Sequence, residues 1–230
     1  MIKENLEVVE NNIRKACDRA GRDYDSVTLI CVSKTKPVEM IEEAVECGKR
    51  EFGENKAQEM KEKYEILPKD LVWHFIGHLQ TNKVKYVVGR ASLIHSVDTL
   101  HLAEAIEAEA EKKDLTVDVL IEVNVAGEKS KFGLTTQETE ELVRGVSKLP
   151  HIRVKGLMTI APFVEDAEEN RGIFRALKDL SVDIAGKNID NVSMDILSMG
   201  MTNDYEVAIE EGATHVRVGT GIFGERDYSI

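Results

Sequence analysis

The sequence has 230 residues, 42% of them hydrophobic, and a formal net charge of -12. This length suits one α/β domain of barrel size, and the composition is that of a globular protein. The negative charge argues against a nucleic-acid binder, because phosphate contacts require clustered Lys and Arg. The three cysteines are an odd number and form no C-x-x-C pair, so we expect neither a disulfide framework nor a thiolate metal site.

The N-terminal stretch MIKENLEVVENNIRK lacks the apolar segment of a signal peptide, and no apolar run reaches the roughly eighteen residues of a membrane span. We therefore expect a cytoplasmic protein. No Pro-, Gly- or Ser-rich linker divides the chain, so residues 1–230 are expected to form a single domain. No long apolar stripe indicates an obligate partner, which favours a monomer.

Short apolar runs rich in β-branched residues alternate with amphipathic runs from end to end. A helix is expected near 3–21, followed by strands at 27–33, 50–53, 72–76, 92–97, 117–125, 152–158, 192–198 and 214–219. Helices between them are expected near 38–48, 55–66, 81–89, 99–113, 136–149, 166–185 and 203–211. Eight strands with helical crossovers predict a (β/α)8 TIM barrel with an extra N-terminal helix, and an open doubly wound sheet is the alternative.

In such a barrel the functional residues lie where strands end. Lys34 directly follows the first strand and shares one side of it with Ile30 and Val32. If that side faces the interior, partial desolvation lowers the pKa of the amine and frees it to attack an aldehyde. A Lys that reaches solvent is the alternative. Lys36 is a competing amine, although Pro37 indicates that it lies in the loop.

Small residues follow strands seven and eight, at 198–203 and 219–221. Backbone N–H groups left open there form the usual phosphate site of this fold, whereas tight turns that need Gly are the alternative. Thr202 or Asn203 is the expected N-cap of the next helix. The G-x-G-x-x-G pattern that ends at Gly224 is not a dinucleotide fingerprint, because only six residues follow it.

Arg217 is predicted to point inward from the last strand, and a buried Arg needs a partner. That partner is either a cofactor ring nitrogen or Glu122 on strand five. Asn55 is interpreted as the N-cap of the second helix or as a cofactor contact. His74 and His78 would lie about 13 Å apart on one strand, too far to share a metal ion, so both are expected to be structural.

Six strings carry a resemblance that covers nearly the whole chain: CVSKTKP (31–37), FGENKAQE (52–59), WHFIGHLQTNK (73–83), KGLMTI (155–160), LSMGMTNDYEVAIEEGATHVRVGT (197–220) and IFGERDYS (222–229). They resemble the YggS/PROSC family of pyridoxal 5′-phosphate (PLP) homeostasis proteins, which is similar to the barrel domain of alanine racemase. The resemblance implies a Schiff base of PLP on Lys34, a phosphate cradle, and an arginine beside the pyridine nitrogen. The implied cofactor-binding residues are Lys34, Asn55, His78, Met158, Ser198, Gly200, Thr202, Arg217, Gly219 and Thr220, although Met158 by itself is read as barrel packing.

The resemblance also implies a PLP carrier or reservoir without catalytic residues or a metal, with apo PLP-dependent enzymes as recipients. Strand eight lies close to the end of this sequence, whereas alanine racemase adds a domain that supplies a second base. An amino-acid racemase-like enzyme is the main alternative, and a Schiff-base lyase acting on a sugar phosphate is another. Lys129 and Lys131 are either a secondary PLP site or part of a solvated loop.

Overall fold

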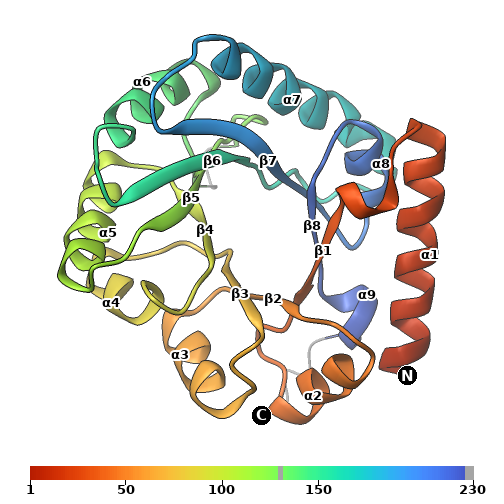
Figure 1. Ribbon diagram of the computed structural model, residues 1–230. Coiled ribbons are helices and arrows are strands. Elements are labelled where there is room, and N and C mark those ends of the chain that lie inside the picture. The colour runs from red at the N-terminus through yellow and green to blue at the C-terminus, as the bar shows by residue number, and fades with distance from the viewer. Residues whose placement is uncertain (129–131, 226–230) are drawn as a thin grey trace.

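The computed structural model describes residues 1–128 and 132–225. Each of its eight strands pairs in parallel with the next, and the first pairs with the last, so the sheet closes into a barrel (Figure 1). The predicted (β/α)8 architecture is therefore confirmed, and the open sheet is wrong. The strands are β1 (Thr28–Val32), β2 (Glu51–Glu54), β3 (Val72–Phe75), β4 (Leu93–Val97), β5 (Val117–Glu122), β6 (Ile152–Met158), β7 (Val192–Met201) and β8 (His215–Val218).

Helices surround the strand ring on the outside, as Figure 1 shows. The expected helix at 81–89 is instead a 3-10 turn followed by a single α-helical turn, and an unexpected short helix follows β8. The helices are α1 (Ile2–Ala20), η1 (Tyr24–Ser26), α2 (Val38–Glu46), α3 (Ala57–Ile66), η2 (Thr81–Lys83), α4 (Val84–Val87), α5 (Leu100–Lys112), α6 (Thr136–Val146), η3 (Ala167–Asn170), α7 (Arg171–Gly186), α8 (Tyr205–Glu210) and α9 (Thr220–Phe223). Within the described part of the chain, no helix has the length and apolarity needed to cross a membrane.

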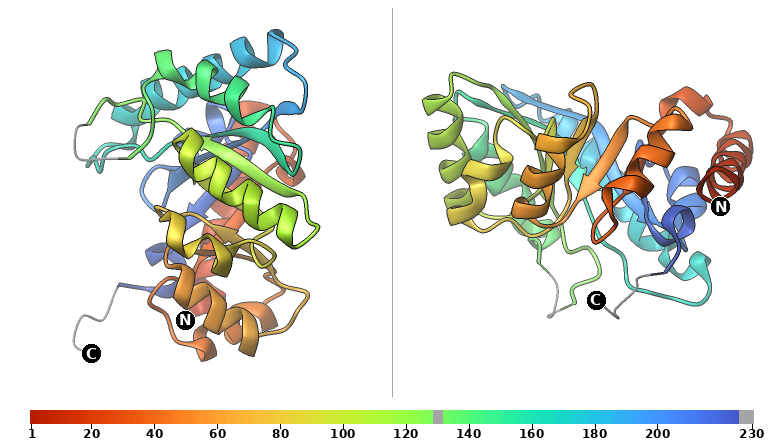
Figure 2. Two further views of the ribbon diagram at one scale, coloured as in Figure 1. Left: turned by 90° about the vertical axis from the view of Figure 1, so that its left-hand side faces the viewer. Right: turned by 90° about the horizontal axis from the view of Figure 1, so that it is seen from below.

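The expected N-terminal helix lies outside the ring against α8 and α9 (Figures 1 and 2). Its buried residues recur at helical spacing and include Leu6, Val9 and Ile13. The Asn5 side-chain amide donates to the Ile222 carbonyl over 2.8 Å, which ties the helix to α9. This packing fixes the last βα unit, one wall of the barrel mouth, from behind.

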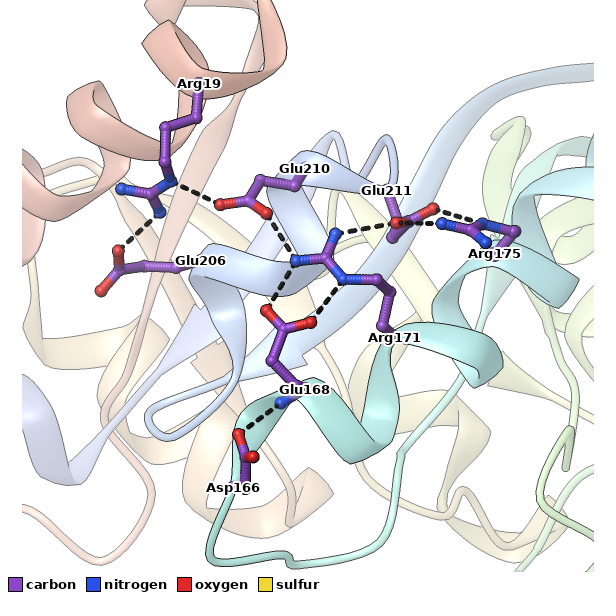
Figure 3. A network of polar contacts seen from close by, with 8 residues as sticks. All are labelled: Arg19, Asp166, Glu168, Arg171, Arg175, Glu206, Glu210 and Glu211. Atoms are coloured by element: carbon purple, nitrogen blue, oxygen red, sulfur yellow. Dashed lines mark hydrogen bonds and ion pairs between the residues drawn. The ribbon is translucent and has the colours of Figure 1, made fainter.

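An arginine–glutamate network joins α1, α8 and the start of α7 on the outer surface (Figure 3). Arg171 contacts Glu210 over 2.6 Å and Glu211 over 2.8 Å, and Arg19 reaches Glu210 over 2.6 Å from α1. The same glutamate therefore joins two helices that lie far apart in sequence. Because these side chains are partly exposed, each pair contributes little alone, but together they hold α8 against its neighbours.

The turn between β7 and α8 differs from the prediction. Strand β7 extends to Met201 rather than ending at 198, and the N-cap of α8 is Asp204, so the predicted caps Thr202 and Asn203 are wrong. The Asp204 carboxylate accepts from the Met201 N–H over 2.7 Å, which moves the start of the helix along the chain. Gly200 has φ 93°, and a Cβ there would lie 2.6 Å from Ala208 Cβ, so glycine lets α8 pack on the strand.

The two faces of the strands build different interiors. Outward-facing side chains, such as Cys31, Phe52 and Trp73, pack with the helices into the main hydrophobic core. Inside the barrel, Leu93, Leu120 and Met158 form a separate small apolar cluster. The predicted packing role of Met158 is confirmed. The interior also holds Ile30 and several polar side chains, among them His95 and Arg217, which lie beneath the candidate site.

Candidate functional site

A cavity of about 380 Å³ opens at the carboxyl ends of the strands, where this fold places its sites. Its walls come from the segments that follow β1, β2, β3, β6, β7 and β8. Six of the ten predicted cofactor-binding residues line it together: Lys34, Asn55, Thr202, Arg217, Gly219 and Thr220. Chain segments up to about 186 residues apart in sequence therefore meet in one pocket.

Lys34 is partly buried and lines the cavity beside Val32, as the strand periodicity predicts. It occupies a tight turn that the Lys36 N–H closes onto the Ser33 carbonyl over 3.0 Å. The Lys36 ammonium group donates to three carbonyls at the end of α9, those of residues 223, 224 and 225, over 3.2, 3.1 and 2.8 Å. Lys36 therefore joins the loop after β1 to the end of α9. This role favours Lys34, and not Lys36, as the reactive amine.

Asn55 is not the N-cap of α3, since that position belongs to Lys56, and the capping interpretation is wrong. Its Oδ1 is buried and has no hydrogen-bond partner among the described residues, although the side chain lines the cavity. A buried acceptor without a donor is costly, and a ligand hydroxyl would remove that cost. Asn55 therefore fits a polar ligand that places a hydrogen-bond donor beside Oδ1.

The opposite wall is built from the ends of β7 and β8. The Thr220 hydroxyl donates to the Thr202 hydroxyl over 3.1 Å, which joins the two loops. At Gly219 a Cβ would approach Val32 Cβ to 3.3 Å, so the glycine keeps this wall close to β1. Small residues with hydroxyl groups and backbone N–H groups suit a phosphate, so the pairing expected of loops seven and eight is present.

Arg217 is 4% exposed and begins a chain of hydrogen bonds that crosses the barrel interior. Its guanidinium donates to Ser198 Oγ and, over 2.9 Å, to the Thr159 carbonyl. Ser198 Oγ lies 2.8 Å from His95 Nδ1, and His95 Nε2 lies 2.9 Å from His74 Nδ1. The chain ends where His74 Nε2 meets Glu51 Oε2 over 2.7 Å at the other end of the barrel.

When both histidines are neutral, one arrangement of protons satisfies this whole chain. The Glu51 carboxylate accepts only, so His74 must carry its proton on Nε2. His74 Nδ1 then accepts from His95 Nε2, and His95 Nδ1 accepts from the Ser198 hydroxyl. Burial, with His74, His215 and Arg217 nearby, holds the pKa of His95 well below its usual range, so this histidine is neutral. In that arrangement every donor points from Arg217 towards Glu51.

The direct hydrogen-bond partners of Arg217, the Ser198 hydroxyl and the Thr159 carbonyl, are thus neutral, while Glu122 acts on it through charge. No direct ion pair joins Arg217 and Glu122 among the contacts of the described residues, so the predicted pair is not formed as such. Burial lowers the pKa of Arg217 to about 10, which leaves it charged at neutral pH. Burial and the charge of Asp98 raise the pKa of Glu122 to about 7, against the opposing effect of Arg217.

Four predicted residues lie outside the cavity lining. Ser198 and Met158 are fully buried inside the barrel, Gly200 lies in β7, and the His78 ring stacks on Phe132 with 3.8 Å between centroids. His74 and His78 have separate surroundings. No group of three or more metal-ligating side chains occurs among residues 1–128 and 132–225. Lys129 and Lys131 lie outside the described residues.

Two groups of polar residues were not predicted from the sequence: the histidine chain, and a cluster of Glu54, Glu59 and Lys63 behind the Lys34 turn. His95 alternates with outward-facing Ile94 in β4, so strand period alone could have placed it inside the barrel. Glu59 and Lys63 are four residues apart on α3, a spacing from which an ion pair along the helix could have been predicted. Nothing in the spacing connects Glu54 to either of them.

Residues 5–227 match the family model of the alanine racemase N-terminal domain. The pyridoxal phosphate homeostasis protein of Aquifex aeolicus (strain VF5) is 50% identical over 226 residues, which are 98% of each chain. This chain belongs to the pyridoxal phosphate homeostasis protein family. Within solved structures, PipY of Synechococcus elongatus PCC7942, determined with PLP bound, is 33% identical, with a TM-score of 0.84 over 97% of this chain and 100% of PipY.

The family barrel also occurs in a larger protein. The chain covers 57% of the alanine racemase of Clostridium difficile 630, with a TM-score of 0.76 and 16% identity. At this level of identity the similarity shows the fold alone. The resemblance of the sequence strings to the PLP homeostasis proteins is confirmed by the 50% identical relative.

Proposed function

We propose that this protein is a PLP carrier or reservoir that holds the ligand as a Schiff base on Lys34. The observation that carries the proposal is the cavity, which brings the Lys34 amine together with the small hydroxyl-bearing residues after β7 and β8. An amine and an anion site in one pocket are what a phosphorylated aldehyde requires. The names of the relatives and the PLP bound to PipY support the same ligand.

We assign different parts of the ligand to different residues around the cavity. Bound PLP supplies an aldehyde, a phosphate and a pyridine ring. The Lys34 amine adds to the aldehyde carbon with loss of one water molecule, and Thr202, Gly219 and Thr220 bind the phosphate. Arg217 faces the ring nitrogen and, as a permanent donor, keeps it unprotonated. The remaining proposed contacts or supports are Asn55, His78, Met158, Ser198 and Gly200.

The test is a visible absorbance spectrum of the protein mixed with PLP, followed by borohydride reduction and peptide mass analysis. The expected result is an imine band and a pyridoxyl group on the peptide that contains Lys34. Both should vanish in Lys34→Ala and persist in Lys61→Ala, a control on the outer face of α3. A band that survives in Lys34→Ala would move the bond to another lysine and overturn the assignment.

We propose that holding PLP, rather than turning over a substrate, is its main role. Racemisation through two bases needs a proton acceptor on each face of the substrate. The described cavity lining contains no His, Tyr or Cys, and its Asp204 is tied to Asn170 over 2.8 Å. An unprotonated ring nitrogen also makes PLP a weak electron sink. The racemase-like alternative predicts deuterium at Cα of alanine incubated with the PLP-loaded protein in deuterated water.

We further propose that the protein acts in the cytoplasm as a monomer with one domain and passes PLP to apo PLP-dependent enzymes. The family names support a role in PLP supply, since homeostasis requires both binding and release. Light scattering of the loaded protein tests the monomer. Reactivation of an apo-enzyme tests delivery, with free PLP at the same free concentration as the control. Equal reactivation by the loaded protein and by free PLP would rule out direct delivery and support a reservoir.

A further inference from the structure

The turn that presents Lys34 is held from behind by a buried ammonium group. Lys63 on α3 is 6% exposed, and its Nζ donates to the Ser33 carbonyl over 2.8 Å. The same Nζ donates to Glu54 Oε1 and to Glu59 Oε1, each over 2.7 Å. One side chain therefore connects β1, β2 and α3 directly behind the residue that precedes Lys34.

Each carboxylate of this cluster makes a second bond to the turn. Glu54 Oε1 accepts from the Ser33 hydroxyl over 2.7 Å, and Glu59 Oε1 accepts from the Thr35 N–H over 2.6 Å. The residues before and after Lys34 are thus tied to the same cluster. The backbone on both sides of the proposed reactive amine cannot shift without breaking a charge-assisted hydrogen bond.

The backbone of the turn also needs this support. Thr35 has φ 63°, a left-handed conformation that β-branched residues rarely adopt and that persists only where the surroundings hold it. Glu54 is fully buried, and its second oxygen has no hydrogen-bond partner among the described residues. A buried ion pair is a weak source of stability, because desolvation opposes the attraction. The cluster is better explained by the geometry it imposes than by the stability it adds.

We propose that Lys63, Glu54 and Glu59 are positioning residues that aim the Lys34 amine at the aldehyde of the ligand. This inference rests on the proposed function. Imine formation makes a bond between the Lys34 nitrogen and the aldehyde carbon and releases one water molecule, so its rate depends on where that nitrogen is held. Misplacement by about 1 Å can slow such a step by roughly 100-fold.

The first test compares Glu59→Ala with Glu59→Gln, which keeps an acceptor for the Thr35 N–H. Apo-protein is mixed with PLP, and the rate of imine formation is followed by absorbance. Affinity for pyridoxine 5′-phosphate, which has the phosphate but no aldehyde, is measured in parallel. We expect Glu59→Ala to slow the imine step by about 10- to 100-fold with unchanged analogue affinity. Glu59→Gln should restore most of the rate, and Glu62→Ala on the exposed face of α3 should match the wild type.

The second test removes the ammonium group. Lys63→Met alone leaves Glu54 buried without its partner, so the double variant Glu54→Gln/Lys63→Met is measured beside it and keeps the test valid if the single variant does not fold. The slowed imine step and the unchanged analogue affinity are expected again. Wild-type rates in Glu59→Ala and in the double variant, or equal losses of rate and analogue affinity, would overturn the positioning role. A wild-type protein that forms no Lys34-dependent imine would instead overturn the proposed function.

Discussion

The two sides of the barrel mouth are supported in opposite ways. On the lysine side, formed by β1, β2 and α3, the turn is held by charged groups in direct contact, the buried Lys63 and Glu54 and the partly exposed Glu59. On the arginine side, formed by β7 and β8, Arg217 is held by neutral groups, Ser198 and then His95. The carboxylate that ends the neutral chain, Glu51, lies at the opposite end of β3 and β2 from the cavity.

The two sides therefore differ in whether the charge of their cation, Lys63 or Arg217, is neutralised by direct contact with a carboxylate. The ammonium group of Lys63 is neutralised by Glu54 and Glu59. It therefore fixes the position of the Lys34 turn and presents no charge to the cavity. Among the described residues, the guanidinium of Arg217 has no carboxylate within hydrogen-bond reach, and its side chain lines the cavity, so its charge is available to a ligand there. Neutral donors aligned in one direction hold an arginine without cancelling it.

Breaking the charged side should cost the most stability. Lys63→Met leaves the fully buried Glu54 without its counter-charge, and removal of one partner of a buried pair costs about 3–5 kcal/mol. Urea unfolding measures the loss. The double variant Glu54→Gln/Lys63→Met should recover much of it, because the fully buried charge is then gone and the one carboxylate that loses Lys63, Glu59, is partly exposed. An equal loss in both variants would show that packing, and not charge, holds this side.

The second prediction concerns pH and Glu122, which faces the arginine side. Its folded pKa of about 7 lies above the ordinary 4.5, so the folded state retains the proton more strongly than the unfolded chain. The resulting stability is fully present below pH 4.5 and is lost as pH rises through 7. Relative to Glu122→Gln, the wild type should lose on the order of 3 kcal/mol between these limits. Unfolding of both proteins at several pH values measures the difference, and a constant difference would contradict it.

Breaking the neutral side should cost less. Ser198→Ala removes the hydroxyl that joins Arg217 to His95 and leaves both without that partner, at about 1–3 kcal/mol. The matched control is Ser193→Ala, since the Ser193 hydroxyl has no hydrogen-bond partner among the described residues. Thermal or urea unfolding compares the two variants. Equal effects would mean that the chain contributes nothing beyond the volume of the hydroxyl group.

The smallest effect is expected on the outer surface, where charge pairs face solvent. Arg19→Ala removes contacts to Glu206 and Glu210 that link α1 to α8, and its side chain is 49% exposed. Exposed pairs contribute about 0.2–1 kcal/mol and weaken with salt. Unfolding at low and high salt should show the difference from wild type shrinking. A large loss of unfolding free energy that does not change with salt would contradict this prediction.

Much of the architecture could be predicted because it follows from local periodicity. Alternation of strand and helix patterns predicted eight βα units, and period two predicted that Lys34 lines the mouth beside Val32. The same rule predicted that Arg217 points inward. Boundaries were less accurate at β7, where the carboxylate of Asp204 moved the helix start, and at α9, where a single turn follows a glycine.

The barrel, the position of the Lys34 amine and the family could all be predicted, because they depend on the order and spacing of residue types along one chain. Only the tertiary structure decided which polar groups meet. Glu51, His74, His95 and Ser198 belong to four strands, and closure of the ring brings them into one line. Glu54 meets Lys63 because α3 packs back on β2. Buried polar groups must find partners wherever the fold places them, and that choice is made in space rather than along the chain.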